Sequence, residues 1–234
     1  MGSILSTVDF CGRGGYACRY PGMKYLWPFI ISLLLTSSLF PPNAAAQASP
    51  TPNSFQWAGL FESLQSAAAS ASVSKSAFGK KPNMGNPFTD IRKDGGFLVG
   101  FVLTKGDWFG APLFQSIQPI YFTPKGKVLG QRRGNLGHDP FTIEAKDGYA
   151  VSSVKILPGI FLFSIQLTFM KIDLIRQALD PSDSYSSDVY GDVTQHPEWT
   201  PNKQLGNSTP IIGLFGYAEN FINGFGVVAA PQAP

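Results

Sequence analysis

A polar loop interrupts an apolar segment near the C-terminus, PIIGLFGYAENFINGFGVV at residues 210–228. The pattern is typical of two short strands joined by a turn, and the turn carries Glu219, Asn220 and Asn223. Carboxylate and amide oxygens accept hydrogen bonds, and amide nitrogens donate them, so this set can bind the hydroxyl groups of a ligand. The same residue types are also common in simple turns. The residues alone leave both interpretations open.

The other residues capable of chemistry are isolated. His138 and His196 each lack a second His or Cys at metal-ligand spacing, so the sequence predicts neither a metal site nor a cofactor. His138 beside Asp139 is interpreted as a turn pair. The motifs G-x-S-x-G, P-loop and H-E-x-x-H are absent.

Acidic residues could serve a glycosidase, which needs two carboxyl groups roughly 5–10 Å apart across a cleft. Glu144, Glu198 and Glu219 are available, and nothing in the sequence pairs them. We therefore predict no catalytic residues and do not expect an enzyme.

Four aspartates, Asp180, Asp183, Asp188 and Asp192, lie in one polar segment. Oxygen-rich loops can hold calcium, although this spacing fits no calcium-loop signature. Asx-turns account for the Asp-Pro and Ser-Asp pairs equally well. Local turn formation is the favoured interpretation.

The charge pattern argues against a nucleic-acid partner. The chain has 234 residues, 14% of them charged, and a net charge of +3 without any block of like charges. Phosphate binding needs a basic stripe. We interpret Arg132 and Arg133 in GQRRGN as a solvated strand end, with a contact to an acidic glycan as the less favoured alternative.

The N-terminal region, residues 1–48, is predicted to be an extension followed by a secretory signal peptide. Lys24 precedes an apolar run over residues 25–40, and small residues follow with an A-x-A site that permits cleavage after Ala46 or Ala48. Cys11 and Cys18 both lie within this part. The expected location is therefore secreted, periplasmic or in the cell envelope, with the export signal as the chain's contact with a membrane.

Residues 49–81 are predicted to be a linker with a partly helical segment, because Leu60, Phe61 and Leu64 recur near a helical period before an Ala-rich run. From Phe97 onward the pattern changes to about ten short strands with turn signals, at the spacing of roughly 8–12 residues that is typical of all-β domains. The predicted domain covers residues 82–230.

Individual strands and turns can be placed. Ile165, Leu167 and Phe169 alternate with polar residues, which predicts a strand with one buried face. Asp147-Gly148 predicts a hairpin between its flanking strands. Residues 180–208 are predicted to form a long polar excursion.

Several pieces occur in a recognisable order over residues 82–228: GGFLVGFVLT, SIQPIY, YAVSSVKI, TFMKI and a closing GLFG…INGFG. This order resembles a jacalin-type lectin domain, and LDPSDSY at residues 179–185 is similar to a bacterial exported variety of such domains. The resemblance implies a β-prism, which is three four-stranded antiparallel sheets about a pseudo-threefold axis.

The resemblance also implies a sugar site at one end of the prism, built from an early Gly loop and a late G-x-x-x-D loop. The early loop corresponds to Gly85 and Asn86. The late loop has Glu219 at the family's Gly and Asn223 at the family's Asp, so both positions depart from the pattern. An amide in place of a carboxylate is expected to weaken hydroxyl binding by about 1 kcal/mol per lost charged hydrogen bond.

The implied carbohydrate-binding residues are Gly85, Asn86, Tyr217, Glu219, Asn220, Phe221 and Asn223. Tyr217 and Phe221 would supply an apolar platform for a sugar face, while Ile222 is expected to anchor the loop in the core. The first hypothesis is a non-enzymatic carbohydrate-binding module with a glycan or glycoprotein partner. The alternative is a sugar-blind β-prism that acts as a structural or protein-interaction module of the cell envelope.

Overall fold

A computed structural model describes residues 54–70, 74–78, 85–157, 159–194 and 196–231. The predicted signal region and both cysteines lie outside these residues. No helix within the described ranges is long and apolar enough to cross a membrane. The folded unit that we describe belongs to residues 49–234.

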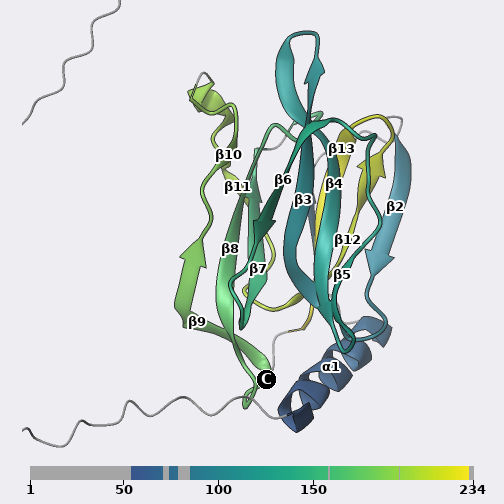
Figure 1. The fold of residues 1–234 in the computed structure, drawn as a ribbon, viewed down its shortest axis with the longest axis vertical. Helices are drawn as coiled ribbons and strands as arrows, with labels where there is room; N and C mark the ends of the chain where they lie inside the picture. Colours follow the sequence, from purple (N-terminus) through teal and green to yellow (C-terminus); the bar gives the residue numbers. More distant parts are fainter. Residues whose placement is uncertain (1–53, 71–73, 79–84, 158, 195, 232–234) are drawn as a thin grey trace, which may run out of the picture. The chain divides into compact units, whose positions relative to one another are not determined.

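Three antiparallel sheets build this unit, and each is organised around one long hairpin (Figure 1). Sheet 1 has the order β1 (Ser74–Phe78), β13 (Ile222–Ala229), β12 (Ile211–Ala218) and β2 (Asn86–Ile91). Sheet 2 has the order β5 (Gly126–Leu129), β4 (Ala111–Thr123), β3 (Phe97–Trp108) and β6 (His138–Glu144).

Sheet 3 has the order β10 (Tyr190–Gly191), β8 (Ser164–Asp173), β7 (Tyr149–Ile156) and β11 (Lys203–Leu205), with β9 (Ala178–Ser186) also paired to β8. β10 pairs with the start of β8 and β9 with its remainder, so these two strands follow each other along one edge. The fold is therefore a β-prism of three sheets, each four positions wide, as predicted.

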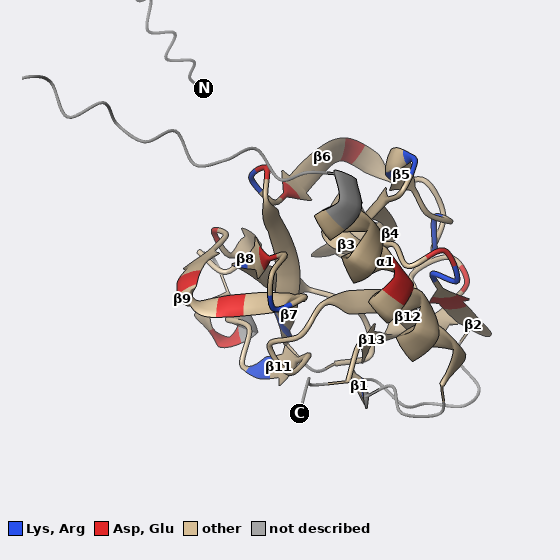
Figure 2. Ribbon diagram, turned by 90° about the horizontal axis from the view of Figure 1, so that it is seen from below, with Lys and Arg blue, Asp and Glu red and all other residues tan. Residues whose placement is uncertain are grey.

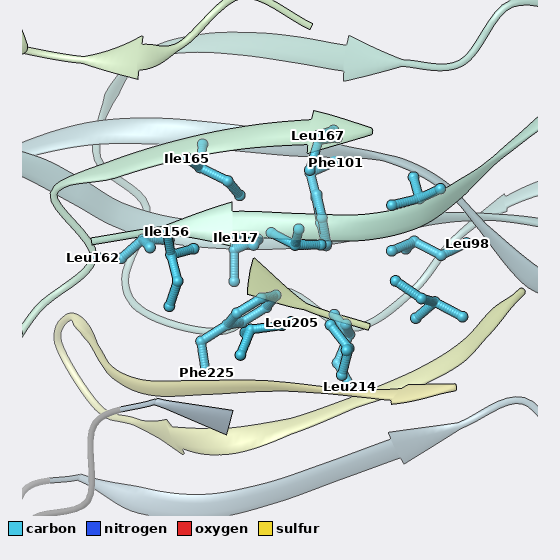
Figure 3. Packing of buried hydrophobic residues seen from close by; sticks show 14 of the residues in the cluster. Leu98, Phe101, Ile117, Ile156, Leu162, Ile165, Leu167, Leu205, Leu214 and Phe225 are labelled. Carbon is cyan, nitrogen blue, oxygen red and sulfur yellow. The ribbon is translucent and has the colours of Figure 1, made fainter. Parts of the chain in front are cut away.

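The interior of the prism receives apolar side chains from all three sheets. The predicted alternation in β8 is confirmed, since Ile165, Leu167 and Phe169 are buried. Phe101 of sheet 2 and Phe225 of sheet 1 meet there edge to face, with ring centroids 5.9 Å apart (Figure 3). Burial of this continuous apolar cluster is the main force that holds the three sheets together.

One end of the prism is covered by α1 (Ser54–Ala69) (Figure 2). Leu60, Phe61 and Leu64 are buried in a second apolar cluster that includes strand residues of all three sheets. The ring of Phe61 stacks on Phe97 with centroids 6.1 Å apart. Because Leu60, Phe61 and Leu64 recur within about one helical turn, they share one face of α1, and this apolar face caps the open end of the prism.

The segment predicted as a linker thus contributes to the folded unit. Besides α1, this segment supplies β1, and every residue of β1 pairs with β13. Phe78 at the end of β1 is buried against Phe225, with ring centroids 6.5 Å apart. Ser74–Phe78 has only one large apolar residue, so its sequence carries almost no strand signal.

The prediction of a hairpin at Asp147-Gly148 is wrong. β6 pairs with β3, and β7 pairs with β8, so this turn carries the chain from sheet 2 to sheet 3. The polar excursion at residues 180–208 also contributes β9, β10 and β11 to sheet 3, together with a short 3-10 helix at Pro197–Trp199.

Candidate functional site

The early loop and the late loop lie side by side at the end of the prism opposite α1. Asn86 pairs with Ala218 at the edge of sheet 1, which brings Gly85 against the β12–β13 turn. Gly85 has φ +86°, and a Cβ there would lie 3.0 Å from the Asn223 Oδ1 atom. Only glycine combines this backbone conformation with so close an approach.

A hollow of about 340 Å³ opens beside this contact. Three of the predicted site residues line it, namely Asn86, Glu219 and Asn220, and all three are exposed. The opposite wall is the connection between β5 and β6, including Arg132 and Arg133. The hollow therefore presents amide, carboxylate and guanidinium groups together.

The aromatic residue of the late loop points toward another neighbour. Phe221 is half-buried and packs on Phe161 of the β7–β8 connection, with ring centroids 5.2 Å apart. Phe161 in turn packs on Trp108, at the end of β3, with centroids 5.1 Å apart. These rings form an apolar support beside the Gly85–Asn223 contact. Ile222 is completely buried, as expected for the residue that anchors the loop.

Tyr217 is separated from the hollow. It lies in β12 opposite Pro87 and Gly224 and lines a different groove with Phe215. Strand alternation sends consecutive side chains to opposite faces, so Tyr217 shares the groove of Phe215, while its neighbour Ala218 lines the hollow. The structure thus brings together six of the seven predicted residues at or beside the tip and places Tyr217 elsewhere.

Arg132 and Arg133 are the residues that the sequence interpretation undervalued. Arg132 is exposed, as a solvated strand end would be, but Arg133 is half-buried and its backbone forms an isolated bridge with Ile117. Asn135 in the same connection donates a hydrogen bond through Nδ2 to Asn220 Oδ1 at 2.9 Å. The RR pair was visible in the sequence, whereas its position beside the late loop was not.

The aspartate-rich segment uses its carboxylates in a turn and in contacts with neighbouring strands. Asp180 accepts hydrogen bonds from the Ser182 backbone nitrogen at 2.9 Å and hydroxyl at 2.6 Å, which is an Asx-turn. Hydrogen bonds from the Tyr149 hydroxyl and Lys171 hold the pKa of Asp183 below its usual value. Within the described residues, no group of three or more His, Cys, Asp or Glu side chains is arranged to hold a metal ion.

The remaining candidates for chemistry are spread over different elements. His138 Nδ1 lies 3.2 Å from Asp139 Oδ2, at the start of β6. Glu144 forms an ion pair with Lys127 at 2.6 Å, while Glu198 lies beside His196 at 3.1 Å. A second hollow, of about 730 Å³, lies between sheets 2 and 3, and it contains none of the predicted site residues.

Solved structures similar to this chain include several lectins, all at low sequence identity. A mannose-binding jacalin-related lectin from Ananas comosus is 15% identical, with a TM-score of 0.46, over 69% of this chain and 100% of that one. Wild-type Malaysian banana lectin is 16% identical, with a TM-score of 0.45, over 68% and 99%. Calystegia sepium agglutinin is 13% identical, with a TM-score of 0.48, over 68% and 97%.

These similarities concern the fold, and the jacalin-related lectins are the group that the order of motifs predicted. No protein-family model matches the chain, and no curated protein matches it either.

Proposed function

We propose that the protein is an exported, non-enzymatic carbohydrate-binding module whose site is the tip formed by Gly85, Asn86 and residues 219–223. The contact between Gly85 and Asn223 is the observation that carries the proposal, because it joins a side-chain amide to a bare backbone at one point of the surface. Exposed polar groups and a supported aromatic ring adjoin that point.

Sugar binding would use these groups in complementary ways. The amide of Asn223 and the carboxylate of Glu219 can bind neighbouring hydroxyl groups, and the carboxylate supplies the charge assistance that Asn223 lacks. Phe221 can contact the apolar face of a sugar ring, since Phe161 fixes it from behind. Glu219 therefore compensates for the acid that is missing at position 223.

A non-enzymatic role is favoured by the distribution of the glutamates. Glu144 is neutralised by Lys127, and Glu198 lies on the short 3-10 helix beside His196. Glu219 lies in the β12–β13 turn. Glu219 is the one acidic residue among the described residues that line the hollow, so the hollow does not supply the pair of opposed carboxyl groups that glycoside hydrolysis requires.

Export is part of the proposal and rests on the sequence of residues 23–48. Cleavage after Ala46 or Ala48 would leave α1 at the start of the mature chain. N-terminal sequencing of the protein recovered outside the cytoplasm should begin at Gln47 or Ser49. Recovery of the whole chain in the cytoplasm alone would contradict export without affecting the binding site.

Binding is tested by titrating the protein against a broad panel of neutral glycans, with and without calcium. Asn223→Ala and Glu219→Ala should each weaken the binding of a glycan by about fivefold to thirtyfold, because each removes one or two hydrogen bonds of about 1 kcal/mol. Asn202→Ala and Glu62→Ala are matched controls, since both residues are exposed in other elements. Both control variants should bind the glycan with the affinity of the unmodified protein.

The outcome separates the two functional hypotheses. Glycan binding that is unchanged by both tip substitutions would remove the site assignment. If no glycan on the panel binds while a protein partner is captured reproducibly and lost on tip substitution, the sugar-blind interaction module would be supported instead.

A further inference from the structure

The connection between β5 and β6 is held rigidly beside the proposed sugar site. The Arg133 backbone nitrogen donates to the Ile117 carbonyl oxygen at 2.9 Å, and the Ile117 nitrogen donates to the Arg133 carbonyl oxygen at 3.0 Å. Gly134 follows with φ +80°. The two arginines are therefore carried on a fixed piece of backbone and not on a free loop.

A second set of contacts joins this connection to the late loop. Besides the bond between their side chains, the Asn135 backbone nitrogen donates to the Asn220 carbonyl oxygen at 3.2 Å. One asparagine thus binds the other through both backbone and side chain. The walls of the 340 Å³ hollow are consequently fixed relative to each other, and its volume falls within the usual range for small-ligand pockets.

The guanidinium of Arg133 is positioned without being neutralised. Its Cζ atom lies over the Phe88 ring, 4.7 Å from the ring centroid, and this cation–π contact orients the guanidinium group. Its Nε atom is buried and has no hydrogen-bond partner. Across the described residues, neither Arg132 nor Arg133 forms an ion pair, whereas Arg92 pairs with Asp94 and Arg176 with Asp173.

The charge of the hollow is therefore positive. Two guanidinium groups face one carboxylate, that of Glu219, which is exposed at the rim. The amides of Asn86 and Asn220 add hydrogen-bond donors on the same walls. Guanidinium and amide donors converging in one concave space are the groups that bind sulfate and carboxylate oxygens.

We infer that the hollow binds an anionic substituent, a sulfate or a carboxylate, of the glycan held at the tip. The inference rests on the proposed function, because the anion would be part of the same ligand. Arg132 and Arg133 provide the charge, Asn86 and Asn220 provide further donors, and the Asn135–Asn220 clamp keeps the anion subsite in register with the sugar subsite. Glu219 lies between the two subsites and opposes the anion.

The test compares matched oligosaccharides in three series, neutral, sulfated and uronic-acid-containing, titrated against the full chain. One anionic series should bind at least tenfold more tightly than its neutral counterpart, and the series that does so identifies the substituent. The double variant Arg132→Gln/Arg133→Gln should lose this preference and keep its affinity for the neutral glycan. Glu219→Gln should strengthen the anionic series about twofold to fivefold.

A charge-matched control excludes a general electrostatic effect. Lys93→Gln/Lys125→Gln removes the same two charges from exposed turns away from the hollow, and the preference should remain. Far-UV circular dichroism and thermal unfolding show whether the double arginine variant is folded. Arg132→Gln alone, at an exposed side chain, gives the answer if Arg133→Gln does not fold.

Each outcome decides between the two proposals. Equal binding of neutral and anionic glycans would overturn the inference and leave the carbohydrate-binding proposal standing. An anionic preference that survives both arginine substitutions would also overturn it, because the anion would then bind elsewhere. Absence of binding to all three series would contradict the proposed function itself.

Discussion

Replacement of Phe101 by Ala is expected to lower the free energy of unfolding by about 3–5 kcal/mol. The Phe101 side chain is completely buried at the centre of the prism (Figure 3), where β3 of sheet 2 faces Phe225 of sheet 1. Removing the ring deletes apolar contacts with more than one sheet and leaves a cavity that the hydrogen-bonded strands cannot easily close. Chemical denaturation followed by fluorescence measures the change.

The matched control is Phe109→Ala. Phe109 lies at the β3–β4 turn and is 92% exposed, so the same truncation there should change the free energy of unfolding by less than about 0.5 kcal/mol. Phe101→Leu should recover most of the loss, because it restores much of the volume. Equal losses for Phe101→Ala and Phe109→Ala would show that the three sheets do not share one core at this point.

Prediction of the fold succeeded where burial imposes a pattern on the residues. In β8, one face is buried in the core and the other is only partly buried. Ile165, Leu167 and Phe169 therefore alternate visibly with polar residues in the sequence. The closing hairpin of β12 and β13 was recognisable for a similar reason, since two apolar segments flank a single polar turn. Such patterns report the surroundings of each residue directly.

Strand pairing is less visible in the sequence, and the turn at Asp147-Gly148 illustrates the reason. Gly148 has φ +82°, so the turn signal itself was correct. A turn of this chemistry reverses or redirects the chain, but it does not determine whether the next strand returns to the same sheet. Here β3 already occupies the pairing edge of β6, and β7 begins another sheet.

The edge strands β1 and β9 were missed in the sequence because they bury few side chains. In β9 only Leu179 is fully buried, so a strand that pairs with β8 reads as a polar excursion. β1 similarly buries Phe78 alone among its large side chains. Backbone hydrogen bonds, which are nearly independent of sequence, account for the placement of both strands.

From the sequence, only those site residues that lie in the early and late loops could be predicted. The resemblance to lectins led to Gly85 and Asn223, and these lie in contact. The arginine connection entered the site through tertiary structure, since Asn135 and Asn220 are 85 residues apart. No local pattern reports such a contact, and GQRRGN therefore looked like an ordinary solvated strand end.

The substitution Gly134→Ala is expected to lower the free energy of unfolding by about 2–5 kcal/mol. A Cβ at this position would lie 2.0 Å from the Gln115 carbonyl oxygen, so the connection must move away from β4. The left-handed backbone, with φ +80°, adds about 1–2 kcal/mol for any residue with a Cβ. Overpacking against a backbone atom supplies the remainder, about 1–3 kcal/mol.

Gly148→Ala separates these two causes. Gly148 has nearly the same conformation, with φ +82°, but a Cβ there would meet nothing within 4 Å. This control should lose only the conformational part, about 1–2 kcal/mol. Hydrogen exchange then locates the damage: in Gly134→Ala the amides of Ile117, Arg133 and Asn135 should exchange faster, because all three donate hydrogen bonds that hold the connection in place.

The Gly134→Ala variant also tests whether the position of the β5–β6 connection controls the binding of anionic glycans. When the connection moves away from β4, the guanidinium groups leave the wall of the hollow and the Asn135–Asn220 clamp opens, so any preference for anionic glycans should disappear while Gly148→Ala retains it. A Gly134→Ala protein that keeps slow exchange at Asn135 would show that the connection adapts without moving. A variant with fast exchange and an undiminished anionic preference would show instead that the arginines act independently of the backbone that carries them.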